Sequence, residues 1–300
     1  MKRARFGTGY ARFLARAWLA GGFLFLFLPM LSLVVFSFKG SAGSSQGGFS
    51  LEWYARLAQD DEILHGLKLS MEIAFLSASG AVVLGTLAAF SLVKYVRFRG
   101  RTLFSAMVSA PLVMPDVVQG LSLLLMLAAL QRAVGFPARG LLTIWLGHLL
   151  IGLSYATVVV QSRLRSLNPQ FEEAAMDLGA RPWQVFTLVT LPMIAQALVS
   201  AWLLTFSLSL DDVIVAEFLN GPGSTTLPLV VFSRARLGGD PRVNAMATVI
   251  IFIVAILIAA TSIWVVHKER RRAAEADEAQ RQDRRAAVLR PADAQRLRRH

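Results

Sequence analysis

The stretch "NPQFEEAAMDLGARPWQVFTLVTLP" (residues 168–192) is polar and charged, although long apolar runs precede and follow it. Asn168 is a good N-cap, and Pro169 suits the first position of a helix. Glu172 and Glu173 then fall in the first turn, where the helix dipole stabilises anionic side chains. The stretch therefore predicts that a short polar helix begins here, between two segments of a very different character.

The same stretch contains the signals that end this helix and begin a second one. Gly179 is a natural residue to end the first helix, Pro182 suits the start of the next, and Leu191-Pro192 is expected to end that one. We predict a bent pair of short helices with small residues at its elbow. Such a pair either packs on its own bundle or admits another surface. Four residues share one face of the first helix at helical spacing: Phe171, Ala174, Ala175 and Leu178.

The composition around this stretch predicts an all-α integral membrane protein. Of the 300 residues, 55% are hydrophobic and only 17% are charged, with a mean hydropathy of +0.54. The apolar residues form runs of about 20 or more, the length that crosses ~30 Å of hydrocarbon as a helix. No Cys is present, so disulfides and thiolate metal sites are excluded. Six transmembrane helices are predicted, at about 18–38, 67–93, 103–130, 141–160, 195–218 and 244–267.

The net charge of +12 follows the membrane pattern and not a nucleic-acid-binding one. Eleven basic residues lie in the tail 268–300, and outside it the loops assigned to the cytoplasm hold twelve against eight in the others. This bias places both termini in the cytoplasm. Residues 1–17 form a short cytoplasmic N-terminus, and the first apolar run is too long for a cleaved signal peptide. The basic tail cannot bury a core and is predicted to be disordered.

Six fixed positions of the opening stretch resemble the EAA loop of ABC importer permeases. That motif reads EAA, three residues, G, nine residues, I, one residue, LP, and here only the Ile is replaced, by Val189. The resemblance implies a type I ABC importer (MetI-like) transmembrane domain over 18–267. It further implies that the loop is a coupling helix held by a separate ATPase. The matching residues are Glu173, Ala174, Ala175, Gly179, Leu191 and Pro192.

This resemblance also implies partner proteins, a cellular location and the absence of an ATP site in this chain. A homologous permease, two ATPase subunits and an extracytoplasmic binding protein would complete the importer in a bacterial cytoplasmic (inner) membrane. The chain has no GxxxxGK[ST] sequence, so ATP and Mg would be bound by the ATPase subunits and this chain would be no enzyme. It would carry no cofactor or metal of its own and contact membrane lipid but no nucleic acid.

Two further stretches narrow the resemblance to the second permease subunit of spermidine/putrescine importers. They are "APLVMPDVVQG" (residues 110–120) and the segment 209–248, which begins "SLDDVIVAEFLNGPG". The similarity extends to about residue 272, so the tail lies outside it. It implies a polyamine as substrate and contact of the loop 220–245 with the polyamine-binding protein. A plain re-entrant hairpin that closes the pore is the alternative for this loop, and the two are compatible.

Four acidic residues are candidates for the substrate path: Asp116, Asp211, Asp212 and Glu217. A carboxylate at membrane depth costs ~2.5–3.5 kcal/mol on insertion scales, so such a residue usually faces a cavity or a partner. Asp116 is expected inside the third span, beside Pro115 and near Pro111, where missing backbone donors leave carbonyls open. No Lys or Arg falls in the centre of a predicted span, which favours an amine cation over an anion. His148, inside the fourth span, is assigned no role beyond packing.

Three alternatives stay open at this stage. An ABC permease of the same fold could carry another substrate, such as iron(III), a phosphonate or an opine. An ion-driven secondary transporter would need no cytoplasmic loop for an ATPase and would usually show internal pseudo-symmetry. A membrane enzyme is disfavoured because the sequence offers no set of nucleophile, base and orienting residue. Which polyamine is carried is not determined by these residues.

Overall fold

The computed structural model describes residues 9–40, 48–95, 97–238 and 240–256, which belong to two compact units. One unit contains residues 1–54 and 244–300, and the other contains residues 55–243. The described residues are helical apart from loops and one isolated antiparallel bridge between Lys39 and Phe49. The all-α fold class is therefore confirmed.

Five helices are long and apolar enough to cross a membrane, within the described ranges. The last apolar helix, Pro241–Ile256, is shorter as far as it is described, and the remainder of the predicted span 244–267 lies outside the described residues, as does the tail 268–300. The five are Phe13–Ser37 within α1 (Gly9–Ser37), α3 (Asp61–Lys94), α5 (Asp116–Val134), α6 (Leu141–Ser166) and Pro182–Asp211.

The predicted third span, 103–130, is two helices and not one. α4 (Arg101–Val113) ends before Met114 and Pro115, which are both extended, and α5 begins at Asp116. A proline disfavours the helical conformation of the residue before it, which explains the extended Met114. The side-chain amide of Gln119 then donates to the carbonyls of Pro111 (2.9 Å) and Met114 (2.7 Å). These two carbonyls therefore have a local donor in Gln119, and the opening of proline-freed carbonyls toward a pathway stays a prediction.

The helix of the predicted fifth span is longer than expected. α8 (Pro182–Val185) continues without interruption into a π-helix, η1 (Phe186–Thr190), and then into α9 (Leu191–Asp211). The prediction that Leu191-Pro192 ends a separate short helix is thus wrong, because these residues begin α9. The π-turn ends at Thr190, directly before Leu191-Pro192, and a proline that lacks an N–H donor is tolerated in the first turn of α9.

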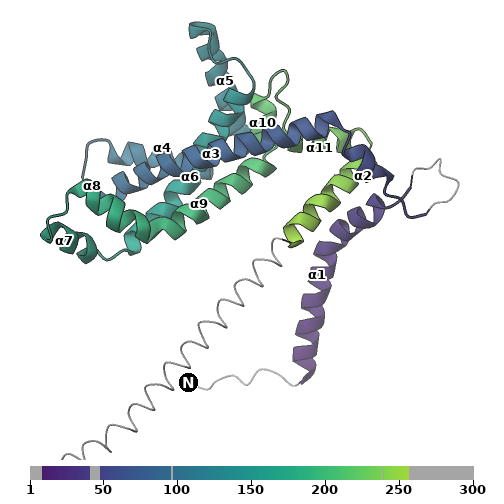
Figure 1. Cartoon of the computed structure of the whole chain (residues 1–300), viewed down its shortest axis with the longest axis horizontal. Helices are drawn as coiled ribbons and strands as arrows, with labels where there is room; N and C mark the ends of the chain where they lie inside the picture. The colour runs from purple at the N-terminus through teal and green to yellow at the C-terminus, as the bar shows by residue number, and fades with distance from the viewer. Residues whose placement is uncertain (1–8, 41–47, 96, 239, 257–300) are drawn as a thin grey trace, which may run out of the picture. The chain divides into compact units, whose positions relative to one another are not determined.

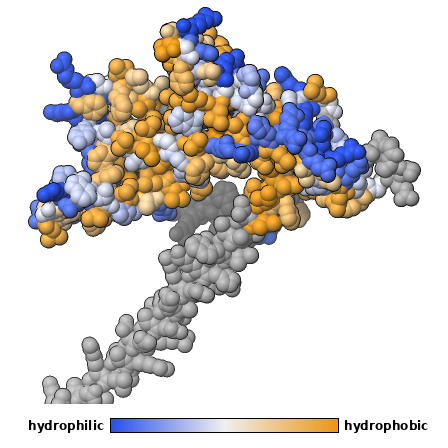
Figure 2. All heavy atoms as spheres, turned by 45° about the horizontal axis from the view of Figure 1, so that its top comes forward, coloured by the Kyte–Doolittle hydropathy of each residue, from blue (hydrophilic) through white to orange (hydrophobic). Residues whose placement is uncertain are grey.

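α3, α6 and α9 form the centre of the unit 55–243 and run side by side (Figure 1). Small residues let them approach closely, since a Cβ added at Gly85 would lie 2.8 Å from the Cβ of Ala156. A Cβ at Gly152 would lie 3.0 Å from that of Ala81. Small-residue contacts of this kind drive helix packing where lipid replaces water. Apolar residues cover the flank of this unit, and hydrophilic residues gather at its ends (Figure 2).

In the other unit, α1 is exposed along most of its length. Phe23, Phe25 and Phe27 are at least half exposed, as expected for lipid-facing side chains. At its end, Ser37 is buried and shares a 2.8 Å hydrogen bond with the Tyr54 hydroxyl. Trp53 Nε1 donates to the Lys39 carbonyl at 2.7 Å, so that this end of α1 is tied to the segment that follows.

Candidate functional site

The EAA loop (168–192) begins with an exposed helix, α7 (Gln170–Asp177). The helix starts one residue later than predicted, because Asn168 Oδ1 accepts a hydrogen bond from the Gln170 N–H at 3.1 Å and Pro169 takes the N-cap position. Gly179 follows with φ of +87°, the left-handed conformation that a non-glycine residue adopts only with strain. α8 then begins at Pro182, as predicted.

Several large apolar side chains of α7, the elbow and the start of α8 are exposed, whereas Val185 and Phe186 further along the loop are buried or pack on α3. Leu178 is 90% exposed and Trp183 62% exposed, and Phe171 and Met176 are exposed as well. Glu173 and Ala174 are also exposed, and Ala175 is half-buried. A polar segment that exposes several large apolar residues together marks an interaction surface.

The side chain that ties α7 to the bundle is that of Glu172, not that of the neighbouring Glu173 of the motif. Its carboxylate is ion-paired with Lys94, the last residue of α3. It also accepts a 2.8 Å hydrogen bond from the hydroxyl of Thr190, a buried residue at the end of η1. Glu172 therefore connects α7 to two of the bundle's long helices. Its place in the sequence indicates only a first-turn position, because Lys94 and Thr190 are distant along the chain.

A polar cavity of about 390 Å³ lies at the other end of α9. Three predicted path residues meet there: Asp116 at the start of α5, Asp211 at the end of α9, and Asp212 just after it. Asp116 thus lies at the first turn of a helix that follows a break, not inside a continuous span as expected. Glu217 lies on α10 (Ile214–Leu219), is exposed and does not line the cavity. Its place in a substrate path stays a prediction.

His148, which its sequence position alone marks only as a packing residue, also lines this cavity. His148 comes from α6, and its Nε2 lies 3.0 Å from Asp212 Oδ2. Its Nδ1 lies 2.7 Å from the hydroxyl of Ser209. Asp212 also caps α10, since it accepts from the backbone N–H groups of Val215 (3.3 Å) and Ala216 (2.7 Å). A separation of 64 residues between His148 and Asp212 leaves no local pattern that could have indicated the pair.

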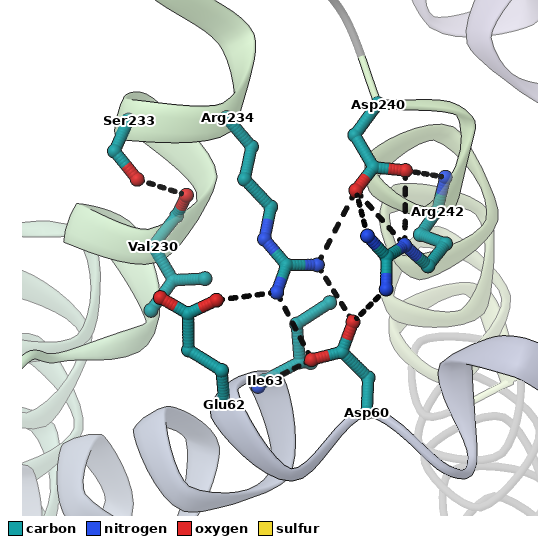
Figure 3. A network of polar contacts seen from close by, with 8 residues as sticks. All are labelled: Asp60, Glu62, Ile63, Val230, Ser233, Arg234, Asp240 and Arg242. Carbon is teal, nitrogen blue, oxygen red and sulfur yellow. Dashed lines mark hydrogen bonds and ion pairs between the residues drawn. The ribbon is translucent and has the colours of Figure 1, made fainter. Parts of the chain in front are cut away.

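A second polar cluster joins the start of α3 to α11 (Leu227–Arg236) and to the segment that follows it (Figure 3). Asp60 accepts from Arg234 Nη1 at 2.7 Å and Nη2 at 3.0 Å, and from Arg242 Nη1 at 2.7 Å. Asp240 binds Arg242, and Glu62 binds Arg234. The Arg234 hydrogen bonds hold the pKa of Asp60 below its usual range. We call these five residues the Asp60 cluster. It fixes α11 and the segment that follows it to the start of α3.

Comparisons with known proteins agree with this geometry. The family model described as "binding-protein-dependent transport system inner membrane component" matches residues 81–274. The chain is 52% identical over 238 residues to "Putrescine transport system permease protein PotI" of Escherichia coli (strain K12), covering 79% of this chain and 85% of that one. It is 34% identical over 251 residues to "Spermidine/putrescine transport system permease protein PotC" of the same organism, covering 82% and 93%. Among solved structures, a bacterial ABC transporter for import of alginate matches with a TM-score of 0.63 and 18% identity, over 87% of this chain and 98% of that one.

Proposed function

We propose that the chain is the permease subunit of an ATP-driven importer of putrescine or a related polyamine. The chain belongs to the family of binding-protein-dependent transport system inner membrane components. The proposal of putrescine as the substrate depends on the 52% identity to a putrescine permease over 79% of the chain. The carboxylates of the cavity support it, because they provide anionic groups for an amine cation.

The lining of the cavity favours a cation on electrostatic grounds. Three carboxylates contribute to it, and the described lining residues include neither Lys nor Arg. Like-charge contact inside a low-dielectric site is strongly unfavourable, so an anionic substrate would be repelled here. The volume of about 390 Å³ is within the range of small-molecule sites. This argument separates amines from sulfate or phosphonate, but iron(III) is also a cation and must be separated by experiment.

The EAA loop supports an ATPase partner. Leu178 and Trp183 are exposed beside the small Ala174, which gives a partner both apolar anchors and room for close approach. We propose that the loop is held in the cleft of an ATPase subunit. ATP binding would then close two ATPase subunits, move the two coupling loops together and open the path outward, and hydrolysis would reset it.

The exposed apolar surface of α5 supports a second permease as the other partner. α5 leaves the bundle of α3, α6 and α9 in Figure 1 and packs chiefly against α10. Large apolar residues along it stay exposed, among them Leu121, Leu125 and Met126. In the assembled importer we place the EAA loop and both termini in the cytoplasm, and the Asp60 cluster on the side of the binding protein.

The test is uptake by the complete complex in proteoliposomes with ATP enclosed. We expect labelled putrescine to enter only with ATP and the binding protein, and unlabelled putrescine to compete where sulfate and iron(III) do not. Uptake that persists without ATP and collapses with a proton ionophore would instead identify a secondary transporter. A crosslinker at Ala174 that never captures the ATPase subunit would contradict the coupling role of the loop.

A further inference from the structure

The three carboxylates of the cavity differ in how many hydrogen bonds they already accept within the protein. Asp212 is mostly buried and accepts from two backbone N–H groups and from His148. The carboxylates of Asp116 and Asp211 are exposed to the cavity, and no described side chain forms a hydrogen bond or ion pair with either. An ammonium group that enters the cavity therefore meets two carboxylates that can accept and one that is occupied.

The occupancy of Asp212 is reinforced by a chain of hydrogen bonds behind it. An ionised carboxylate only accepts, so His148 Nε2 carries the hydrogen that points at Asp212. His148 Nδ1 is then free to accept from the Ser209 hydroxyl at 2.7 Å. The Ser77 hydroxyl lies 3.2 Å from that of Ser209 but donates its one hydrogen to the Ile73 carbonyl at 2.6 Å, so the chain of donors to Asp212 runs from Ser209 through His148.

The burial of this chain fixes the imidazole in one orientation. The His148 side chain is 3% exposed, and Ser77 and Ser209 are buried as well. Because both ring nitrogens have partners, rotation of the ring would leave buried polar atoms unsatisfied. Asp212 is thereby held in the turn between α9 and α10, next to Asp211 in the chain.

We infer that His148 is a positioning residue of the substrate path, and that Asp116 and Asp211, not Asp212, are the carboxylates that contact the substrate. His148 holds Asp212, and Asp212 in turn holds the bend that presents Asp211 to the cavity. This inference rests on the proposed function and names its substrate class more closely.

The pair of free carboxylates selects a substrate with two positive ends. Asp116 comes from the first turn of α5 and Asp211 from the last turn of α9, so they belong to separate elements that face one cavity. A diamine can neutralise both, whereas a monoamine leaves one carboxylate unpaired. The cavity is therefore matched to diamines and longer polyamines over monoamines of the same length.

The first experiment measures binding of labelled putrescine to the detergent-solubilised permease–ATPase complex without the binding protein, by equilibrium dialysis. We expect Asp116→Asn and Asp211→Asn each to weaken binding by about tenfold or more, since each removes a charge-assisted contact. Butylamine should bind as weakly to the unmodified complex as putrescine does to these variants. The melting temperature of both variants should stay that of the unmodified complex.

The second experiment tests whether His148 acts by holding Asp212 in place. Asp212→Asn and His148→Leu should lower the melting temperature and should not be additive in the double variant, because they break the same contact. His148→Gln, which can keep a donor near the Nε2 position, should recover stability and uptake, whereas His148→Asn, which reaches only toward Ser209, should not.

Two outcomes would overturn the inference. One is that Asp212→Asn weakens putrescine binding with unchanged stability. The other is that Asp116→Asn and Asp211→Asn leave binding intact. If the unmodified complex instead binds no putrescine at all but takes up another substrate, the proposed function itself is wrong, and this result is distinguishable from the two above.

Discussion

Replacement of Asp60 by Asn should destabilise the protein markedly, because it removes the charge at the centre of the Asp60 cluster. The Asp60 side chain is only 5% exposed and binds two guanidinium groups, those of Arg234 and Arg242. Asn keeps the side-chain oxygen that caps α3 by accepting from the Ile63 N–H, so the cap is retained. The measured loss of stability is then due to the broken ion pairs alone.

The size of the destabilisation depends on the ion pairs that Arg234 and Arg242 retain in the variant. Breaking a buried ion pair costs ~3–5 kcal/mol when a charge is left without a partner. Arg234 retains Glu62 and Arg242 retains Asp240, so we expect the lower end, about 3 kcal/mol. For a chain of this size that corresponds to a fall in Tm of roughly 6 °C or more.

The assay is thermal unfolding of the purified subunit in detergent, with Glu62→Gln as the matched control. Glu62 pairs with the same arginine but its side chain is 59% exposed, and exposed pairs contribute only about 0–1 kcal/mol. The pKa of Asp60 is lowered in the fold, so its stabilisation is present above the unfolded value of about 3.9 and is lost as pH falls through the lowered pKa. The reasoning is refuted if Asp60→Asn and Glu62→Gln lower Tm equally.

Three further predictions concern the loop and the break in the third span. Glu172→Gln should lower putrescine uptake per ATP hydrolysed, since it removes the link from α7 to the bundle, while Asp177→Asn on the same helix should not; equal ratios in the two variants would contradict it. Gly179→Ala forces a side chain into a left-handed residue and should cost about 1 kcal/mol, seen as weaker retention of the ATPase subunit on an affinity column; undiminished retention would argue against a rigid elbow. Gln119→Leu leaves two carbonyls without their donor and should lower stability by about 1–3 kcal/mol in thermal unfolding, whereas an unchanged Tm would mean that other groups satisfy them.

Local signals in the sequence predicted the elements better than their interruptions. The apolar runs and the N-terminal signals of α7 depend on neighbouring residues, and so they were visible in the sequence. The division between α4 and α5 was not predicted, although Pro115 lies there. Whether a helix bends at a proline or stops depends on what satisfies the freed carbonyls, and Gln119 supplies that answer only once the chain is folded.

The candidate site shows the same limit at longer range. Residue type and position selected Asp116, Asp211 and Asp212 as candidates, because carboxylates are rare in apolar segments, and all three line one cavity. Their different hydrogen-bond partners depend on contacts between distant residues. His148 and Asp212 are 64 positions apart, and Asp60 and Arg234 are 174 apart, so pairing could not be inferred from spacing.

The unbroken helix from Pro182 to Asp211 has a mechanical consequence. Its 30 residues correspond to a rod of about 45 Å at 1.5 Å per residue, with Trp183 near one tip and Asp211 at the opposite tip. A tilt of only ~5° about either tip would swing the opposite one by roughly 4 Å, given that length. In the proposed importer, a rotation of the rod about its ATPase end would move Asp211 by more than the length of a hydrogen bond, enough to release a bound amine without any rearrangement inside the rod.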